Sequence, residues 1–549
     1  MTFPLGERMG EEGVIFVRKA TGLVREVGWF TCMSMALCHT IGGGINFFSV
    51  KAIYAYPHAN VWAGYAIGGI PVVCLAICLS LMGVAMPRTG GDYIYISRCL
   101  NPFLGFISNW MFWWCDALVY GLIAYLDIWF WGLSFWVFGN MAGVEWLMRV
   151  GETMQKGWAC LVGGIILDII WYVIGLLGTK TLGYAMNVTM VIPLVSGILL
   201  IICLFGWPLW YPSVEYAWDK LFGDGAYAAI IDIAKSQGWK EGLYWPGHRG
   251  FAAGPTFAVM VPATWAYIGA TSGVYIGSEV KAPTKSMIAG SAAAAIFIMV
   301  YYVLLTGGLY TAFGPFVQAY NYAVNAPDDV WNAAFTARGL KPMPKFAPML
   351  PLFATVLAPH PVVGFLVSIH GAFWLMNDIP AFQFVCSRAI FAWAFDRFFP
   401  EFLAAVNDRF HSPHWALTVV FLIGLIGVVL THVSPWFAMG LTTNFFMWRA
   451  LFAQLTAIIY PFVRPDIWER GLKLSLGPIP LETLFGIIGL PFWIIIFGHT
   501  FLELISVLSW FVFNAIIFTI GCIIFVGYWR YNVARGISVK ELYTEIPPA

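Results

Sequence analysis

Seven ionisable side chains lie inside long apolar stretches of the sequence, and they are Asp116, Asp127, Asp168, Asp378, Arg449, His39 and His370. An ionised group at bilayer depth costs at least about 2.5 to 3.5 kcal/mol, so such residues are candidates for function. A buried carboxyl group can select a cation or carry a proton. These residues therefore indicate binding or coupling chemistry within a membrane.

Asp116 is the strongest candidate among the carboxylates, because it lies near the middle of the predicted span 103–135. It either selects a cationic substrate group or carries a coupled proton; a hydrogen bond to a neighbouring helix is the alternative interpretation. Asp127 follows three helical turns later on the same face, and we expect it to be solvated near the outer surface. Asp168, in the predicted span 157–178, is interpreted as structural.

Asp378 and Arg449 have similar predicted depths in the membrane. Either charge alone would be uncompensated there, so we expect the two residues to form a buried pair. Asp116, Asp378 and Arg449 are the predicted coupling or gating residues. His39 and His370 are interpreted as packing histidines rather than ligands.

Three consecutive glycines, Gly42, Gly43 and Gly44, interrupt the first apolar stretch between Ile41 and Ile45. Each glycine weakens a helix by roughly 1 kcal/mol. Any backbone group released in lipid must be satisfied by protein, water or ligand. Glycines can also serve close helix packing, but a contiguous triplet favours a functional break that includes Thr40.

A second interruption occurs in the sixth stretch, over Ala266, Tyr267, Ile268 and Gly269. Glycine-interrupted spans at corresponding places of two halves are typical of inverted-repeat transporters. Amides at half-helix N-termini attract an anion, whereas freed carbonyls accept hydrogen bonds from an ammonium group. Together the two interruptions predict a binding site for a zwitterion.

The composition excludes a soluble protein. Hydrophobic residues make up 60% of the 549 residues, charged residues make up 10%, and the mean hydropathy is +0.78; soluble domains carry about 25% charged residues. The net charge of +1 provides no basic surplus for nucleic acid. The ten cysteines lie almost all in apolar runs and are interpreted as small buried residues.

About 20 apolar residues are needed to cross a bilayer as a helix. The sequence predicts an all-α integral membrane protein with twelve spans. Their approximate ranges are 26–55, 60–86, 103–135, 157–178, 182–207, 254–279, 286–313, 361–392, 413–432, 435–462, 482–500 and 504–530.

Lys and Arg residues concentrate in the tails and short loops on one side of these spans. On the other side, most of them lie in two long loops, 208–253 and 314–360, which count little for orientation. The pattern predicts cytoplasmic N- and C-termini, with no cleaved signal peptide. Segments 226–237 and 328–338 of the long loops are predicted surface helices, acting either as a lid or as a cover over loop ends.

Four sequence blocks carry a family resemblance, and they are Ile41 to Ile45, Pro87 to Trp110, Gly269 to Glu279 with the following VKAPTKS, and Ser387 to Asn407. Together they resemble the amino acid-polyamine-organocation permeases. The resemblance extends over about residues 20 to 465, and the last two spans match in hydropathy only. It implies a leucine-transporter-like fold, with a five-plus-five inverted repeat, broken helices 1 and 6, and two accessory helices.

The same resemblance implies a secondary transporter in the cell membrane that moves amino acids or related amines by alternating access. Gly42, Gly43 and Gly44 would then bind the substrate carboxylate, and carbonyls near Ala266, Tyr267 and Gly269 would bind its ammonium group. Thr40, Ile41, Ile45, Ile268 and Asp116 complete the predicted substrate site. Asn46, Ala270 and Thr271 depart from the family pattern, and span five has no lysine beyond Lys180 at its edge.

The predicted organisation has six parts. These are a cytoplasmic tail at 1–25, a first repeat at 26–207, an outer loop at 208–253, a second repeat at 254–462 that contains the outer loop 314–360, accessory helices within 463–530, and a cytoplasmic tail at 531–549.

Two other function classes were compared with transport. A haem or copper oxidase would need several intramembrane histidines, and few are present, so we predict no enzyme activity, cofactor or metal. A transport-inactive permease fold serving as a scaffold in a membrane complex is the alternative. The predicted partners are an amino acid or amine, the lipid bilayer, a proton as candidate coupling ion, and proteins at the outer loops.

Overall fold

The structure, a computed structural model, describes residues 16–17, 20–242 and 252–548. In these residues the regular secondary structure is helical except for a two-stranded hairpin, β1 (Ser475–Leu476) and β2 (Ile479–Pro480). Within the described part of the chain, eleven helical stretches are long and apolar enough to cross a membrane. They are Val61–Ala85, Pro102–Ala142, Gly157–Leu176, Thr179–Leu209, Ala253–Tyr275, Pro283–Phe313, Pro361–Phe395, His414–Val433, Asn444–Val463, Leu481–Ser506 and Leu508–Ala534.

The first predicted span is helical in separate pieces. The α-helix α1 (Trp29–Cys38) is followed by a short non-helical stretch, a π-helical turn η1 (Gly44–Phe48) and the α-helix α2 (Ser49–Ala55). The glycine triplet lies where α1 has ended and η1 begins. Hydrogen bonding is therefore irregular at the point where the glycines weaken the helix.

The sixth stretch is also irregular. The α-helices α11 (Ala253–Ala258) and α12 (Met260–Ala266) give way to 3₁₀ turns η4 (Ile268–Tyr275) and η5 (Gly277–Glu279). A run of 3₁₀ structure this long is uncommon and often marks a functional hinge.

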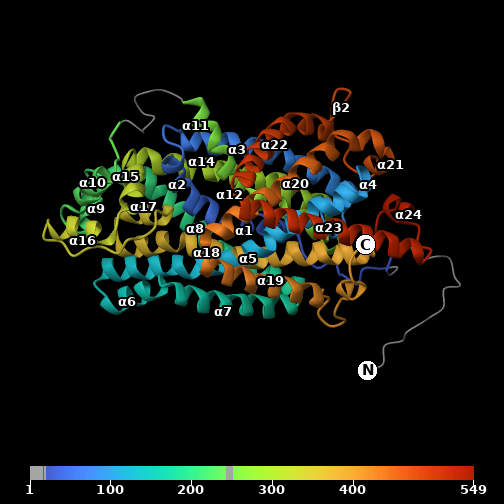
Figure 1. The fold of residues 1–549 in the computed structure, drawn as a ribbon, viewed down its shortest axis with the longest axis horizontal. Coiled ribbons are helices and arrows are strands. Elements are labelled where there is room, and N and C mark those ends of the chain that lie inside the picture. Colours follow the sequence, from blue (N-terminus) through green and yellow to red (C-terminus); the bar gives the residue numbers. More distant parts are fainter. Residues whose placement is uncertain (1–15, 18–19, 243–251, 549) are drawn as a thin grey trace.

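The long helices run broadly along one direction, as Figure 1 shows. At one end lie α9 (Val214–Phe222), α10 (Ala226–Ser236) and α16 (Asp328–Thr336), and we call this end the loop face. At the opposite end lie α4 (Asp92–Cys99), α21 (Pro465–Trp468) and α24 (Val539–Thr544), and we call it the terminal face.

The centre of the bundle is formed by α5 (Pro102–Ala142) and α18 (Pro361–Phe395), which pack along each other. The first and sixth segments lie beside them. Helices α7 (Gly157–Leu176), α8 (Thr179–Gly206), α22 (Leu481–Ser506) and α23 (Leu508–Ala534) are peripheral, with most residues of their apolar windows half-buried or exposed. Exposed Ile, Val and Leu side chains on these four helices form the surface that suits lipid.

The remaining helical elements connect or cover this framework. They are α3 (Val61–Ala85), α6 (Glu145–Met154), η2 (Trp207–Leu209), α13 (Pro283–Ile288), η6 (Ala289–Ala293), α14 (Ala294–Phe313), α15 (Phe316–Ala323), α17 (Leu350–Val356), η7 (Glu401–Ala404), α19 (His414–Val433) and α20 (Pro435–Val463).

Helix α5 is longer than the predicted span 103–135. It begins with Pro102 after Asn101, whose side chain caps the amides of Phe103 and Leu104, and it ends at Gly143 with φ of 68°. Because the helix continues to Ala142 and is covered by α6, α7 and α18, Asp127 is only 1% exposed. The expectation that Asp127 is solvated is therefore wrong.

The predicted surface helices at 226–237 and 328–338 are confirmed as α10 and α16. Helix α10 packs on α9, α15 and α16. The two helices thus pack against each other at the loop face.

Candidate functional site

The interruptions of the first and sixth segments lie against each other. A side-chain carbon added to Gly44 would come within 2.5 Å of the Ala266 Cα atom, and one added to Gly269 would overlap the His39 backbone. Only glycine allows the two backbones to approach this closely. The glycines thus place the two irregular segments in contact at the middle of the bundle.

Several carbonyls at the interruptions accept hydrogen bonds from tyrosines. The Tyr302 hydroxyl lies 2.7 Å from the Thr40 oxygen and 3.0 Å from the Ala266 oxygen, and the Tyr65 hydroxyl donates to the Gly44 oxygen at 3.0 Å. In contrast, the amides of Gly43 and Gly44 donate to no acceptor among the described residues. Buried amides without a partner are rare and are expected to meet water or a ligand.

A cavity of about 30 Å³ opens beside these free amides. Its lining comes from four parts of the chain, and comprises His39, Thr40, Gly43, Gly44, Cys115, Asp116, Val119, Ile123, Trp265, Ala266, Ile268, Asp378 and Phe382. The structure thus brings seven of the predicted site residues to one cavity, and these are Thr40, Gly43, Gly44, Ala266, Ile268, Asp116 and Asp378. Ile41, Gly42, Ile45, Tyr267, Gly269 and Arg449 lie outside its lining.

Gly42 and Tyr267 do not line the cavity but contact residues next to it. A side chain on Gly42 would overlap the carboxylate of Asp378, so the glycine lets this carboxylate approach the first segment. The Tyr267 hydroxyl donates to the Tyr65 oxygen at 3.1 Å.

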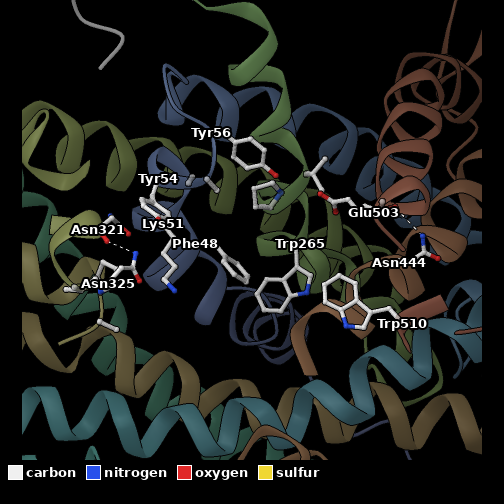
Figure 2. Close-up of a pocket in the computed structure, with 18 of the residues that line it drawn as sticks. Phe48, Lys51, Tyr54, Tyr56, Trp265, Asn321, Asn325, Asn444, Glu503 and Trp510 are labelled. Carbon is white, nitrogen blue, oxygen red and sulfur yellow. Dashed lines mark hydrogen bonds between the residues drawn. The ribbon is translucent and has the colours of Figure 1, made fainter. Parts of the chain in front are cut away.

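A much larger vestibule of about 660 Å³ lies toward the loop face (Figure 2). Phe48, Lys51, Trp265, Glu503 and Trp510 contribute to its lining. Trp265 borders both the vestibule and the small cavity. Its ring packs edge-on against Phe48 with 4.8 Å between centroids, so this aromatic pair separates the two spaces.

On the other side of the cavity, the terminal face is held closed by a buried ion pair. Arg388 of α18 donates from Nη2 to the Glu279 Oε2 atom at 2.9 Å and to the Thr179 hydroxyl at 2.6 Å. The Glu279 oxygen of the main chain accepts from the amides of Glu26 and Val27. These contacts tie the first segment, the sixth segment, α8 and α18 together.

The predicted pairing of Asp378 with Arg449 is wrong. Arg449 Nε donates to Asp92 Oδ1 at 2.8 Å, and its Nη2 donates to the Thr271 hydroxyl at 2.6 Å. Asp378 has no ion pair within the described residues, and its Oδ1 has no hydrogen-bond partner there. Similar depth along two helices does not bring side chains together, because each helix also has a rotational setting that depth does not specify.

The sequence model of the amino acid permease family matches residues 27–528. The chain belongs to the amino acid permease family. A serine/threonine exchanger, SteT of Bacillus subtilis, is 23% identical over 418 residues, which is 75% of this chain and 78% of the relative. A D-serine/D-alanine/glycine transporter of Escherichia coli is 23% identical over 403 residues, covering 70% of each chain.

A shorter stretch of the permease, 109 residues, is 34% identical to a probable GABA permease of Pseudomonas aeruginosa, covering 19% of this chain and 23% of the relative. These relatives are transporters by name, and the family indicates a transporter rather than an enzyme. Across the described residues, no group of three or more His, Cys, Asp or Glu side chains is placed to hold a metal ion.

Two residues of this permease that depart from the family pattern, Asn46 and Thr271, make side-chain hydrogen bonds. Asn46 donates to the Gly42 oxygen at 2.9 Å and contacts His370 Nδ1 at 2.9 Å, and His370 Nε2 lies 2.7 Å from the Tyr301 hydroxyl. This satisfied network agrees with the interpretation of His370 as a packing residue. The second departure, Thr271, is the hydroxyl partner of Arg449.

Sequence reasoning gave no functional role to His39, which lines the cavity, or to Asp92, which holds Arg449 outside it. His39 Nε2 lies 3.4 Å from Asp116 Oδ2, and its ring packs edge-on against Phe382. Asp92 begins α4 and also contacts Asn109 and Tyr275. The sequence feature that could have identified Asp92 was its position within the block Pro87 to Trp110. Asp168 is buried on α7 and does not line the cavity.

Proposed function

We propose that this permease is a secondary active transporter of amino acids or related amines that works by alternating access. The observation that carries the proposal is the small cavity where the first and sixth segments meet, at the base of a vestibule. Free amides at Gly43 and Gly44 are available to a carboxylate, and unpartnered acceptors at Asp116 and Asp378 are available to an amino group.

The proposed transport cycle uses the two barriers on either side of the cavity. Phe48 and Trp265 form the thin barrier toward the vestibule, and the Arg388–Glu279 pair belongs to a thick barrier toward the terminal face. In this conformation the path is closed on the terminal face and is blocked on the vestibule face by side chains alone. Rotation of Trp265 would admit substrate, and separation of the Arg388–Glu279 pair would release it.

For the fold, we propose that the three pieces between Trp29 and Ala55 together form a twelfth crossing. The first and sixth crossings would then be the two discontinuous helices of an inverted five-plus-five repeat, with α22 and α23 as accessory helices. Support comes from the packing of α1 on η4 and η6 and from the irregular hydrogen bonding in both segments. The predicted boundaries at 26–207, 254–462 and 463–530 follow from this arrangement.

We further propose that the loop face lies outside the cell and that both tails are cytoplasmic. The support is the distribution of Lys and Arg in the sequence. Of the predicted N-terminal tail, residues 1–15, 18 and 19 lie outside the described residues. Asp116 and Asp378 are proposed to contribute to coupling; Arg449, held by Asp92, is proposed to stabilise the barrier toward the terminal face.

A transport-inactive scaffold is not favoured. An arginine that blocked the pocket would favour such a scaffold, but Arg449 is engaged by Asp92 and Thr271 and does not line the cavity. The family and the named activities of the relatives also favour transport.

The proposal is tested by uptake of radiolabelled amino acids and amines into liposomes that contain purified protein. A side-chain carbon at Gly43 would meet only Ile123, at 3.9 Å, so Gly43→Val should fold and fill the cavity. We expect uptake to fall to background. Gly498→Val on α22, where an added carbon meets nothing within 4 Å, is the matched control and should transport normally. Normal uptake by Gly43→Val would show that substrate binds elsewhere.

A further inference from the structure

The segment 539–548 begins with α24 and lies across the terminal face (Figure 1), and we call it the strap. Its apolar side chains are turned toward the protein: Val539 is 4% exposed, Leu542 is 0% exposed and Tyr543 is 5% exposed. Lys540, on the other side of the short helix, is exposed. The strap is therefore a docked element with one buried face.

Three arginines from different parts of the chain donate to main-chain oxygens of the strap. The pairs are Arg464 Nη2 with the Thr544 oxygen at 3.1 Å, Arg98 Nε with the Glu545 oxygen at 3.4 Å, and Arg88 Nε with the Pro547 oxygen. Hydrogen bonds from ionised donors are roughly twice as strong as those between neutral groups. Because the acceptors are main-chain atoms, these bonds fix the path of the strap over the terminal face.

Tyr543 joins the strap to the end of α18. Its hydroxyl lies 3.2 Å from the Tyr93 hydroxyl, which donates to Asp396 Oδ2 at 2.7 Å. Asp396 directly follows α18 and also accepts from Arg98 Nη1 at 2.6 Å. The Tyr543 ring packs on Phe398 with 5.3 Å between centroids, and the Arg98 guanidinium lies 4.9 Å from the centre of the same ring. The strap thus completes a buried polar and aromatic cluster on the α18 side.

The far end of the strap is attached to the sixth segment through Arg88. This arginine belongs to the loop that precedes α4, and the loop is bonded to the sixth segment. The Thr89 amide donates to the Ser278 hydroxyl at 3.0 Å, and the Gly90 amide donates to the Tyr275 oxygen at 3.1 Å. The hydrogen bond from Arg88 therefore connects the strap to a loop that the sixth segment holds.

The end of the strap lies where these two sides meet. A narrow cavity of about 10 Å³ there is lined by Pro547 and Pro548 of the strap, by Ser278 of the sixth segment, and by Phe395 and Asp396 at the end of α18. A cavity needs roughly 10 to 15 Å³ to hold one water, so the three parts are packed closely. The strap therefore contacts α18 and the sixth segment at the same place.

We propose that the strap is an autoinhibitory latch, which holds the terminal face closed by bridging the end of α18 to the sixth segment. The Arg388–Glu279 pair joins the same two parts of the chain. In the proposed transport cycle these parts must separate to release substrate, so the strap must first give up its contacts on one side. Undocking of the strap then sets how often the terminal face opens. The inference builds on that cycle, but opening is measurable without any substrate.

The test is hydrogen exchange, followed by mass spectrometry, on the purified full-length protein. The reporters are the amides of Glu26 and Val27, which bond to the Glu279 main-chain oxygen rather than to the strap. Tyr543→Ala removes the docked ring, and Arg88→Ala removes the donor that ties the strap to the loop before α4. We expect each variant to raise exchange at both reporter amides by at least about tenfold, which is the effect of losing one hydrogen bond to a charged group.

Two further variants and a distant helix provide the controls. Lys540→Ala changes an exposed side chain of the same short helix, and its exchange should match wild type. Tyr543→Phe keeps the ring but loses the hydroxyl, so its effect should be smaller than that of Tyr543→Ala. Amides of α10, at the loop face, should exchange at the wild-type rate in every variant. If Tyr543→Ala does not fold, Arg88→Ala decides the question.

Two results would overturn the inference. Wild-type exchange at Glu26 and Val27 in Arg88→Ala and Tyr543→Ala would show that the strap does not hold the terminal face closed. Equal acceleration at α10 would show that the strap stabilises the whole molecule rather than this face. Both results leave the proposed function standing, whereas absence of uptake of every amino acid and amine by wild-type liposomes would refute transport and leave the exchange result unchanged.

Discussion

At the scale of single residues, two sets of charged groups in the membrane interior differ in their partners. Arg449 and Asp92 form a buried pair supported by Thr271, Tyr275 and Asn109. Asp116 and Asp378 remain without a cation beside the cavity. The first set stabilises the fold near the terminal face, and the second set is available to a ligand.

The pairing of Arg449 is testable by a double-mutant cycle. Asp92→Asn should lower the free energy of unfolding by about 3 to 5 kcal/mol, because it leaves Arg449 buried without its carboxylate. Adding Arg449→Gln should recover much of that loss. The measurement is thermal unfolding in detergent. Asp378→Asn combined with Arg449→Gln is the matched cycle, and its effects should add within about 0.5 kcal/mol; strong coupling there would contradict the assigned pairs.

At the scale of elements, the terminal face is closed by contacts among four segments. Thr179 at the start of α8 donates to Glu279 Oε2 and accepts from Arg388, while the Glu279 main-chain oxygen binds the amides of Glu26 and Val27. The Thr179 hydroxyl therefore helps to link the first segment, the sixth segment and α18. In the proposed transport cycle, release toward the terminal face requires local opening of this network.

Thr179→Val should weaken this closure without unfolding the protein. Loss of the hydroxyl removes hydrogen bonds worth about 1 kcal/mol each, so local opening should become about fivefold more frequent. Hydrogen exchange at the amides of Glu26 and Val27, followed by mass spectrometry, measures the effect. Thr181→Val is the matched control, because Thr181 lies on the same turn and its hydroxyl donates only to the Leu177 oxygen at the end of α7, outside the Arg388–Glu279 network. Equal exchange in both variants would show that Thr179 does not contribute to closure.

At the scale of the whole molecule, the two faces differ in construction. The loop face carries the vestibule and the helices α9, α10 and α16. At the terminal face, the C-terminal helix α24 is docked: Leu542 is buried, and the Tyr543 hydroxyl lies 3.2 Å from that of Tyr93. Burial raises the pKa of the Tyr543 phenol, so this contact stays uncharged through the physiological range. Such asymmetry suits a molecule that faces different compartments.

The orientation in the membrane is testable with two exposed lysines. Lys235 lies on α10 at the loop face and Lys540 on α24 at the terminal face, and both are exposed. A membrane-impermeant maleimide added to intact cells should label Lys235→Cys and should label Lys540→Cys only after lysis. The ten native cysteines are buried or half-buried, which keeps background labelling low. The opposite pattern would invert the proposed topology.

The sequence alone determined the membrane class, most of the crossings and the place of the glycine interruptions. These properties depend on local composition: apolar runs cross bilayers, and a glycine triplet weakens a helix wherever that helix packs. Seven of the predicted site residues meet at one cavity because the glycine interruptions that marked the site in the sequence also allow the two backbones into contact.

Tertiary structure alone decided which side chains meet. Asp92 rather than Asp378 is the partner of Arg449, His39 faces the cavity, and Asp127 is buried because α5 continues beneath α6. Each of these outcomes depends on the rotation, length and crossing of helices that are distant in sequence. Hydropathy specifies the depth of a residue along its helix, but the direction of its side chain is set by how neighbouring helices pack.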